Sequence, residues 1–367
     1  MTLLTVNSGS TSVKLALYDA GSAGAPTRVA AEQHSGESLD ARSLLGAFTA
    51  KLSAPPRAIA HRIVHGGTRF AAPTLIDAAV IAAIEELSPL APLHNPAGLR
   101  WVKATRELWA ETPQVAVFDT AYFHKLPRVA AEYALPTALG VERGVRRYGF
   151  HGLAHEAMWH AWCGLYPDLV QGGRLITVQL GGGCSMSAIE RGRPVDTSMG
   201  FSPLEGLVMA TRSGDIDAAV IPYLQRELTL TGDEVITALN RRAGLAGMSG
   251  TDANPTQLLA DPSPQAQFAA DLYCYRLRKF LGAYFAVLDG CDGIVFGGGV
   301  GEHAPQVRAR AVAGLAWAGV ALDAGLNQAA CGGSARISAA TSAVKVHVIA
   351  TDEESVLARA AAAIARA

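Results

Sequence analysis

The chain has 367 residues, of which 50% are hydrophobic and 17% are charged, and its formal net charge is −1. This length corresponds to roughly two domains, and the apolar content excludes an intrinsically disordered protein. The balanced charge, without a basic stretch, excludes a nucleic-acid-binding surface, and no apolar run reaches the roughly 18 residues of a membrane span. The five scattered cysteines, with an N-terminus that lacks a signal-peptide pattern, predict free thiols and a cytoplasmic location.

Strands alternate with helices in the first half of the chain. The opening stretch LLTVNSGSTSVKLALYD has two strand-forming runs around a Gly/Ser turn, and GSAGAPT after it is typical of a short loop or hairpin tip. The pattern then predicts, in chain order, a strand over 58–67, helices over 77–87 and 95–108, and a strand over 114–122. Pro96 stands at the first position of the second helix, where its missing N–H is harmless.

The second half shows the same alternation. The strand-forming run RLITV leads into QLGGGCS, and residues 268–288 form a long apolar helix. A strand with a glycine loop is expected over 292–303 and a helix over 302–312. A late strand over 344–354 precedes a closing helix over 354–367. Strands alternating with helices predict an α/β fold.

Two hairpins of similar sequence suggest an internal repeat. TVNSGSTSVKLAL, residues 5–17, aligns without gaps on TVQLGGGCSMSAI, residues 177–189. Thr5, Val6, Gly9 and Ala16 meet identical residues in this alignment. One such hairpin in each half indicates a duplicated fold.

Glycine-containing loops follow three of the predicted strands, over 7–14, 179–185 and 297–302. Glycine allows backbone N–H groups to point into one concavity and approach an anion closely. Neither triple-glycine loop fits the G-x-G-x-x-G dinucleotide pattern, and the chain has no Walker A motif. One such loop is as typical of a hairpin turn as of an anion site, but three loops, two of them apparent repeats, favour phosphate binding.

Polar residues stand in otherwise apolar surroundings at several places. Arg62 lies in HRIVHGG, Asp119 ends an expected strand, and Arg212 lies in a Gly/Ser turn. His151 and His155 have the spacing of a metal-binding helical pair, but the glycine between them and the lack of a third ligand argue against a metal there. Phosphoryl transfer requires cations around the phosphoryl oxygens and carboxylates that bind Mg²⁺, and arginines can also hold a carboxylate substrate. These residue types therefore suit phosphoryl transfer.

Ordered blocks along nearly the whole chain resemble the acetate kinase family, within the acetate/sugar kinase, heat-shock ATPase and actin superfamily. The blocks are NSGSTSVK, HRIVHGG, APLHNP, FDTAY, RYGFHG, DTSMGFSPLEGL, TRSGDID, GGGVGE and TDEE. The resemblance implies a duplicated ribonuclease H-like, actin-like ATPase fold, with domains over 1–123 plus 355–367 and over 124–354 and an active-site cleft between them. It also implies reversible transfer of the ATP γ-phosphoryl group to acetate, giving acetyl phosphate and ADP by direct in-line transfer.

The resemblance assigns roles to matching positions. Catalysis would rest on Arg62, Asp119, His151 and Arg212. Acid binding would involve Arg62, Val64, Leu93, His94, Phe150 and Pro203. The nucleotide and its phosphates would contact Ser10, Ser12, Lys14, Gln179, Leu180, Gly181, Gly182, Gly183, Gly297, Gly298, Gly299, Val300 and Gly301. Asn7 and Glu353 would hold Mg²⁺, or Mn²⁺ in its place, and the protein would be a homodimer that binds ATP or ADP as co-substrate.

Gln179 and Gly182 depart from the family pattern, which has histidine and asparagine in these places. A glutamine donates only a neutral hydrogen bond, so a lower rate is expected. The alternatives are a kinase for another short-chain acid such as propionate, a pyrophosphate-dependent or low-activity acyl-phosphate enzyme, an acyl phosphatase, and a catalytically silent nucleotide-binding paralogue. The acid-pocket residues favour acetate, and the glycines at 297–299 favour ATP because they leave room for adenosine.

Overall fold

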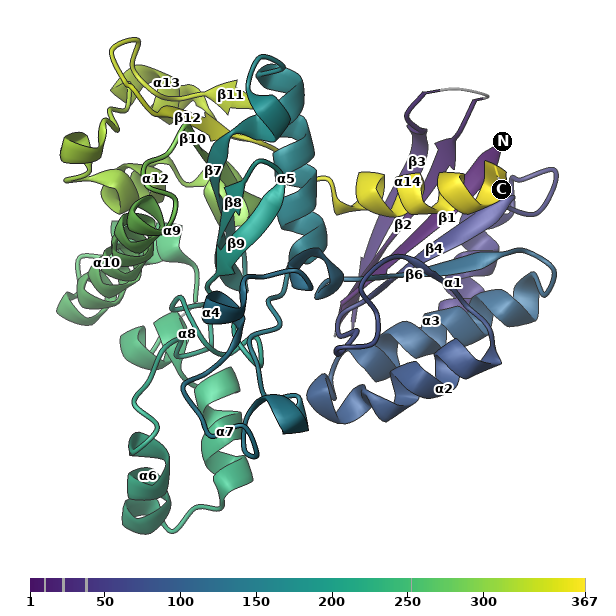
Figure 1. The fold of residues 1–367 in the computed structure, drawn as a ribbon, viewed down its shortest axis with the longest axis horizontal. Helices are drawn as coiled ribbons and strands as arrows, with labels where there is room; N and C mark the ends of the chain where they lie inside the picture. Colours follow the sequence, from purple (N-terminus) through teal and green to yellow (C-terminus); the bar gives the residue numbers. More distant parts are fainter. Residues whose placement is uncertain (10, 22–23, 37–38, 252, 367) are drawn as a thin grey trace. The chain divides into compact units, whose positions relative to one another are not determined.

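The computed structural model describes residues 1–9, 11–21, 24–36, 39–251 and 253–366 (Figure 1). The chain divides into two compact units, one of residues 1–124, 150–157 and 352–367 and one of residues 125–149 and 158–351. Each unit contains one six-stranded sheet covered by helices, which confirms the predicted α/β class. The first unit includes residues 150–157, which the expected domain limits (1–123 plus 355–367, and 124–354) assigned to the second domain.

The first unit is a mixed sheet between two helical layers. Its strands are β1 (Thr2–Ser8), β2 (Ser12–Asp19), β3 (Thr27–Ser35), β4 (Ala58–Ile63), β5 (Thr74–Leu75) and β6 (Gln114–Phe118), in the order β3-β2-β1-β4-β6-β5. Its helices are α1 (Ala41–Thr49), α2 (Ala78–Glu86), α3 (Asn95–Leu108), the first residues of α5 (Gly152–Leu165), α14 (Glu353–Arg366), and the 3-10 turns η1 (Ser88–Leu90) and η2 (Ala121–Phe123). Helix α14 lies on one face of the sheet, and α1, α2 and α3 lie on the other (Figure 1).

Alternation along the strands decides which side chains face α14. Leu3 of β1 belongs to the apolar core beneath α14, whereas Leu4 and Val6 belong to the core beneath α1 and α3. Because side chains on a strand alternate between faces, Asn7 lies on the same face as Leu3, toward α14. Arg62 of β4 follows Ala58 and Ala60 onto this face for the same reason.

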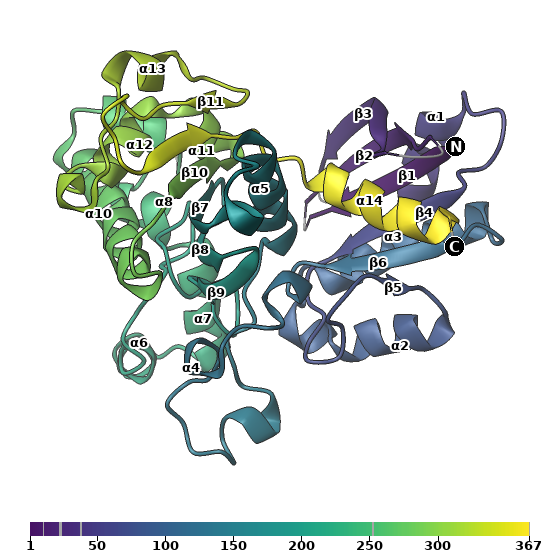
Figure 2. The same cartoon turned by 45° about the horizontal axis from the view of Figure 1, so that its top comes forward.

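The second unit repeats the arrangement with a larger helical complement. Its strands are β7 (Arg174–Leu180), β8 (Cys184–Glu190), β9 (Arg193–Thr197), β10 (Gly293–Gly297), β11 (Ala335–Arg336) and β12 (Lys345–Val348), in the order β11-β12-β10-β7-β8-β9. Its helices are α4 (Arg128–Ala131), the rest of α5, α6 (Val220–Leu228), α7 (Gly232–Arg241), α8 (Gly244–Ser249), α9 (Pro255–Ala260), α10 (Pro264–Val287), α11 (Gly298–His303), α12 (Pro305–Val312), α13 (Ala324–Ala329), and the 3-10 turns η3 (Val141–Arg143), η4 (Val170–Gly172) and η5 (Ala316–Ala318). Helices α5 and α10 lie on opposite faces of this sheet (Figure 2).

The two sheets have the same topology, which confirms the predicted duplication. In each, an antiparallel three-stranded meander is followed by two parallel strands and a short antiparallel edge strand. The gapless alignment of the two hairpins is wrong in its second strand, however. Thr5 pairs with Ala16, but Thr177 pairs with Ser187, not with Ala188. The turn of the second hairpin is one residue shorter, so the match between Ala16 and Ala188 joins residues on opposite faces.

The ends of several predicted elements differ from the structure. The glycines after β10 were expected to form a loop, yet Gly298 opens helix α11. The predicted strands over 58–67 and 344–354 end early, at Ile63 and Val348. Within the described part of the chain, no helix is long and apolar enough to cross a membrane.

Candidate active site

The carboxyl ends of β1, β4 and β6 bring three predicted site residues of the first unit together. Arg62 at the end of β4 donates through Nε and Nη2 to the carboxylate of Asp119, which follows β6, with the shortest contact at 2.6 Å. Arg62 Nη1 donates to Asn7 Oδ1 at 3.2 Å. Adjacent parallel strands end at the same edge of a sheet, which explains how residues 55 and 57 positions apart meet here.

The Arg62–Asp119 pair is almost shut off from water. The side chains are 15% and 1% exposed. Burial lowers the pKa of Arg62, but Asp119, Glu353 and Glu354 outweigh this effect and raise it. Burial raises the pKa of Asp119, and the two-point contact with Arg62 and a hydrogen bond from the Leu153 N–H oppose that rise. We regard both groups as charged, because a buried carboxylate held in this two-point geometry is stabilised in its ionised form.

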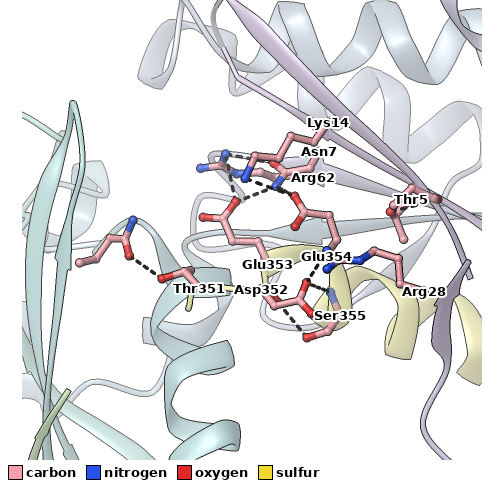
Figure 3. A network of polar contacts seen from close by, with 12 residues as sticks. Thr5, Asn7, Lys14, Arg28, Arg62, Thr351, Asp352, Glu353, Glu354 and Ser355 are labelled. Carbon is pink, nitrogen blue, oxygen red and sulfur yellow. Dashed lines mark hydrogen bonds and ion pairs between the residues drawn. The ribbon is translucent and has the colours of Figure 1, made fainter. Parts of the chain in front are cut away.

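Two carboxylates at the start of α14 complete this cluster (Figure 3). Asn7 Nδ2 donates to Glu353 Oε2 at 2.7 Å and to Glu354 Oε1 at 2.8 Å. Arg62 lies 3.8 Å from Glu353, and Lys14 lies 3.8 Å from Glu354. Burial raises the pKa of Glu353, but Arg62, Asn7 and Lys14 together bring it below its usual value. The sequence reasoning missed Glu354, whose only signal was the acidic doublet in TDEE.

His151 reaches the same neighbourhood through a tight junction. Its φ is +57°, a left-handed conformation that costs roughly 1 kcal/mol for a residue other than glycine. The next residue, Gly152, opens α5, and a Cβ there would collide with the carbonyl oxygen of Asp119. One turn later His155 is fully buried, and burial lowers its pKa to about 3. The junction therefore fixes the start of α5 against the backbone of Asp119, while His155 stays neutral inside the unit.

The predicted acid-binding residues of the first unit lie next to the ends of three elements. Val64 follows β4, Leu93 and His94 precede α3, and Phe150 precedes α5. Val64 and Phe150 are buried, and Leu93 is 50% exposed. His94 caps α3, and its neighbour Asn95 exchanges two hydrogen bonds of 3.0 Å with the backbone of His65. The sequence reasoning missed Asn95, which joins the loop after β4 to the start of α3.

The QLGGGCS stretch in the second unit forms the turn between β7 and β8. Gly181 N–H donates to Gly183 O at 3.0 Å, and Gly182 O accepts from Ala210 N–H at 3.2 Å. Leu180 is fully buried, and nothing lies within 4 Å of a Cβ added at Gly182. The turn is therefore tied to the segment that carries Arg212 and is open at Gly182.

Gln179 belongs to a network around the first turn of α11. Its Oε1 accepts from Thr351 Oγ1 at 3.2 Å. Gly298 N–H donates to that hydroxyl at 2.9 Å and to Glu302 Oε1 at 3.1 Å, and Glu302 also accepts from Thr351 N–H at 3.0 Å. Gly298 has a φ of +75°, and a Cβ there would lie 2.5 Å from Leu180 O. The sequence reasoning missed Thr351 and Glu302, which hold the glycines in place.

The rest of the glycine segment 297–301 is held by a buried arginine of α12. Gly297 and Gly301 are buried, whereas Gly299 has open space around it. Arg308 of α12 is fully buried and donates to Gly301 O at 2.8 Å and to Glu302 O at 3.1 Å. It thereby binds the carbonyl groups at the end of α11, next to Val300, while Gly299 in the first turn is exposed.

Arg212 is held differently from Arg62. Its Nη1 donates to Pro203 O at 3.0 Å, and among the residues that the structure describes it forms no ion pair. Burial lowers its pKa, but a guanidinium remains charged at neutral pH. A partly buried cation without a carboxylate is suited to an anionic ligand.

Other predicted residues have a plain structural setting. Ser12 begins β2, and its carbonyl accepts from Gly9 N–H at 2.8 Å, while Ser10 lies outside the described residues. Within the described ranges, no group of three or more His, Cys, Asp and Glu side chains is arranged to hold a metal ion by itself.

Comparisons with known proteins point in one direction. The model of the acetokinase family matches residues 32–359. The chain is 47% identical over 299 residues to an acetate kinase of Streptomyces coelicolor, covering 81% of this chain and 74% of that protein.

Two crystal structures match nearly the whole fold. An acetate kinase of Porphyromonas gingivalis has a TM-score of 0.88 and 32% identity, with 99% of both chains covered. A propionate kinase of Francisella tularensis subsp. tularensis has a TM-score of 0.86 and 32% identity, with 98% of both chains covered. The chain therefore belongs to the acetokinase family.

Proposed function

We propose that the protein is an acetate kinase that transfers the γ-phosphoryl group of ATP reversibly to acetate. The observation that carries this proposal is the placement of Arg62, which is buried, charged and fixed at two points by Asp119 and at a third by Asn7. Such preorganisation lets a cation stabilise a charged transition state without rearranging. The acetate kinases among the relatives support acetate as the acceptor.

The reaction we propose needs no general base. An acetate oxygen attacks the γ-phosphorus in line, the bond to the bridging oxygen breaks, and ADP leaves with that electron pair. The carboxylate is already deprotonated, so catalysis consists of positioning and charge neutralisation. Arg62, Arg212, His94 and His151 would neutralise phosphoryl and carboxylate oxygens, and Asp119 would hold Arg62 in place. Val64, Leu93, Phe150 and Pro203 would surround the methyl group.

The donor set of the first unit fits Mg²⁺. Magnesium is usually held by one or two carboxylates together with substrate phosphates and water, so a cage made by the protein alone is not required. Glu353 has a lowered pKa and is 13% exposed, which leaves it charged and reachable. Asn7 donates its amide nitrogen to Glu353, so we propose that Asn7 orients this carboxylate and that the two residues together would hold the ion. The bound ion would neutralise part of the negative charge on the phosphate oxygens.

Gln179–Gly183 and Gly297–Gly301 would bind the nucleotide, together with Ser10, Ser12 and Lys14 at the first turn. The open space at Gly182 and Gly299 supports this assignment. A homodimer in the cytoplasm, where ATP is available and thiols stay free, completes the proposal; all five cysteines are unpaired.

A propionate kinase is the second candidate, because a structure with that activity matches the fold as closely as the acetate kinases do. The test is acyl hydroxamate formation from ATP and Mg²⁺ with acetate, propionate or butyrate. We expect the highest kcat/KM with acetate. A higher value with propionate would reassign the acceptor, and phosphate release without ADP would replace the kinase by a phosphatase.

A further inference from the structure

Tyr133, Arg147 and Glu205 form a polar cluster in the second unit that the roles above leave unused. We propose that this cluster positions Arg212 and Pro203 for the acid substrate, with Glu205 as the central positioning residue. The inference rests on the proposed function and deepens it, because it names what orients the second arginine of the site.

Both carboxylate oxygens of Glu205 are engaged. Oε1 accepts from Arg147 Nη2 at 2.5 Å, and Oε2 accepts from the Tyr133 hydroxyl. The Arg147 guanidinium also lies 5.8 Å from the centre of the Tyr133 ring, within the range of a cation–π contact. The Arg147 and Glu205 side chains are 18% and 31% exposed, so the ion pair is only partly screened by water.

The same cluster holds the beginning of the segment 198–215, which we call the arginine loop because Arg212 lies in it. Arg147 Nη1 donates to the carbonyl oxygens of Thr197 and Ser198 at 3.2 Å each. The Tyr133 hydroxyl accepts from Phe201 N–H at 2.8 Å. The arginine loop is therefore fixed on both sides of Pro203, at residues 197–201 and at Glu205.

Pro203 transmits this position to Arg212. Its carbonyl oxygen accepts from Arg212 Nη1 at 3.0 Å, and no carboxylate in the described ranges takes over that role. Within the arginine loop, Gly206 N–H donates to Asp215 Oδ1 at 2.8 Å, and Asp215 N–H donates to Gly206 O at 3.0 Å, so the residue after Glu205 is also joined to the end of the loop. A shift of Glu205 therefore moves Pro203, and Pro203 moves the guanidinium.

Gly200 shows how closely the cluster and the loop are fitted. A Cβ at this position would collide with the carboxylate of Glu205 and with the Tyr133 hydroxyl. Gly200 O meanwhile accepts from Tyr148 N–H at 3.0 Å, so the glycine cannot withdraw without breaking that bond. Any side chain at residue 200 would displace Glu205.

The experiment compares Glu205→Gln with Glu132→Gln. The control pair is matched, because Glu132 also accepts from an arginine in the same unit, Arg128, at 2.5 Å, but Arg128 is 83% exposed. We expect Glu205→Gln to raise the KM for acetate roughly tenfold, the effect of weakening one charged hydrogen bond, and to leave the KM for ATP unchanged. Tyr133→Phe should act in the same direction by a smaller factor, and Glu132→Gln should change neither constant.

A second measurement separates positioning from a general loss of structure. Hydrogen exchange of the peptide 198–206 should accelerate in Glu205→Gln, and the propionate-to-acetate activity ratio should change because Pro203 moves. Faster exchange with an unchanged acetate KM and unchanged ratio would overturn the inference, and so would equal rises in both KM values. A parent protein that phosphorylates none of the acids would refute the proposed function, whereas unchanged exchange in Glu205→Gln would refute the positioning role alone.

Discussion

Replacing Gln179 by histidine tests what the side chain at the end of β7 does. Gln179 Oε1 accepts from Thr351 Oγ1 at 3.2 Å, and that hydroxyl accepts from the first N–H of α11 at 2.9 Å. A shorter, rigid imidazole does not reproduce this contact. A neutral hydrogen bond contributes about 1 kcal/mol, so we expect the KM for ATP to rise roughly fivefold. We expect no gain in kcat, because the side chain at 179 is engaged by Thr351 at the start of α11, the helix proposed to bind the nucleotide.

The assay is ADP formation against ATP concentration at saturating acetate. Thr351→Val should raise the KM for ATP by a similar factor, and Thr351→Ser, which keeps the hydroxyl, should not. Gln179 and Thr351 share one hydrogen bond, so either single variant already removes it. The double variant should therefore have a KM for ATP no higher than that of the more impaired single variant. A histidine variant with a higher kcat and an unchanged KM for ATP would refute the reasoning, because residue 179 would then act on the transferring phosphoryl group.

Three further outcomes are expected. Arg62→Ala should reduce kcat by orders of magnitude, because it removes a preorganised cation and leaves Asp119 buried and unpaired; a near-normal kcat would contradict the assignment. Gly152→Ala should destabilise the protein by about 1–3 kcal/mol in urea unfolding and lower kcat, since the new Cβ displaces the Asp119 backbone; unchanged values would show that the junction yields freely. Burial lowers the pKa of His61 to about 3. A histidine kept neutral in the folded state stabilises it fully above the unfolded pKa near 6.5 and progressively less as pH falls, so the parent should lose about 2 kcal/mol more than His61→Gln between pH 7 and pH 5; equal losses would contradict this.

The sequence was sufficient for the class of fold and for its duplication, because strand and helix periods and repeated hairpins are local patterns. It also indicated Arg62 and Asp119, which the structure brings together at strand ends as parallel pairing requires. It did not indicate that Asn7 joins Glu353 to Glu354. Asn7 is 346 and 347 positions from these two glutamates in the chain, and the packing of α14 on the sheet brings them together.

Two predictions were wrong at the ends of strands, one about strand register and one about a helix start. The gapless match of the hairpins ignored that a shorter turn slides the returning strand by one position and reverses its faces. Glycine is a poor helix former, yet a helix begins in the glycines after β10, where Glu302 and Thr351 satisfy the N–H of Gly298 and stabilise the helix start. Neither effect can be recognised in the local sequence.

The shared topology allows the two sheets to be compared position by position, and the comparison shows a division of labour between the halves. Asn7 and Gln179 occupy the same place in their sheets, and one strand further on Arg62 of the first half corresponds to Gly297 of the second. A side chain at Gly297 would meet Thr351 Oγ1 at 2.5 Å and Met158 Sδ at 2.6 Å. Where the first half holds a cation, Thr351 and Met158 leave no room for a side chain in the second half. A protein fused from two copies of either half would therefore contain two such cations or none. Only two halves that diverged after the duplication can supply both the cation of the first half and the close-packed glycine of the second.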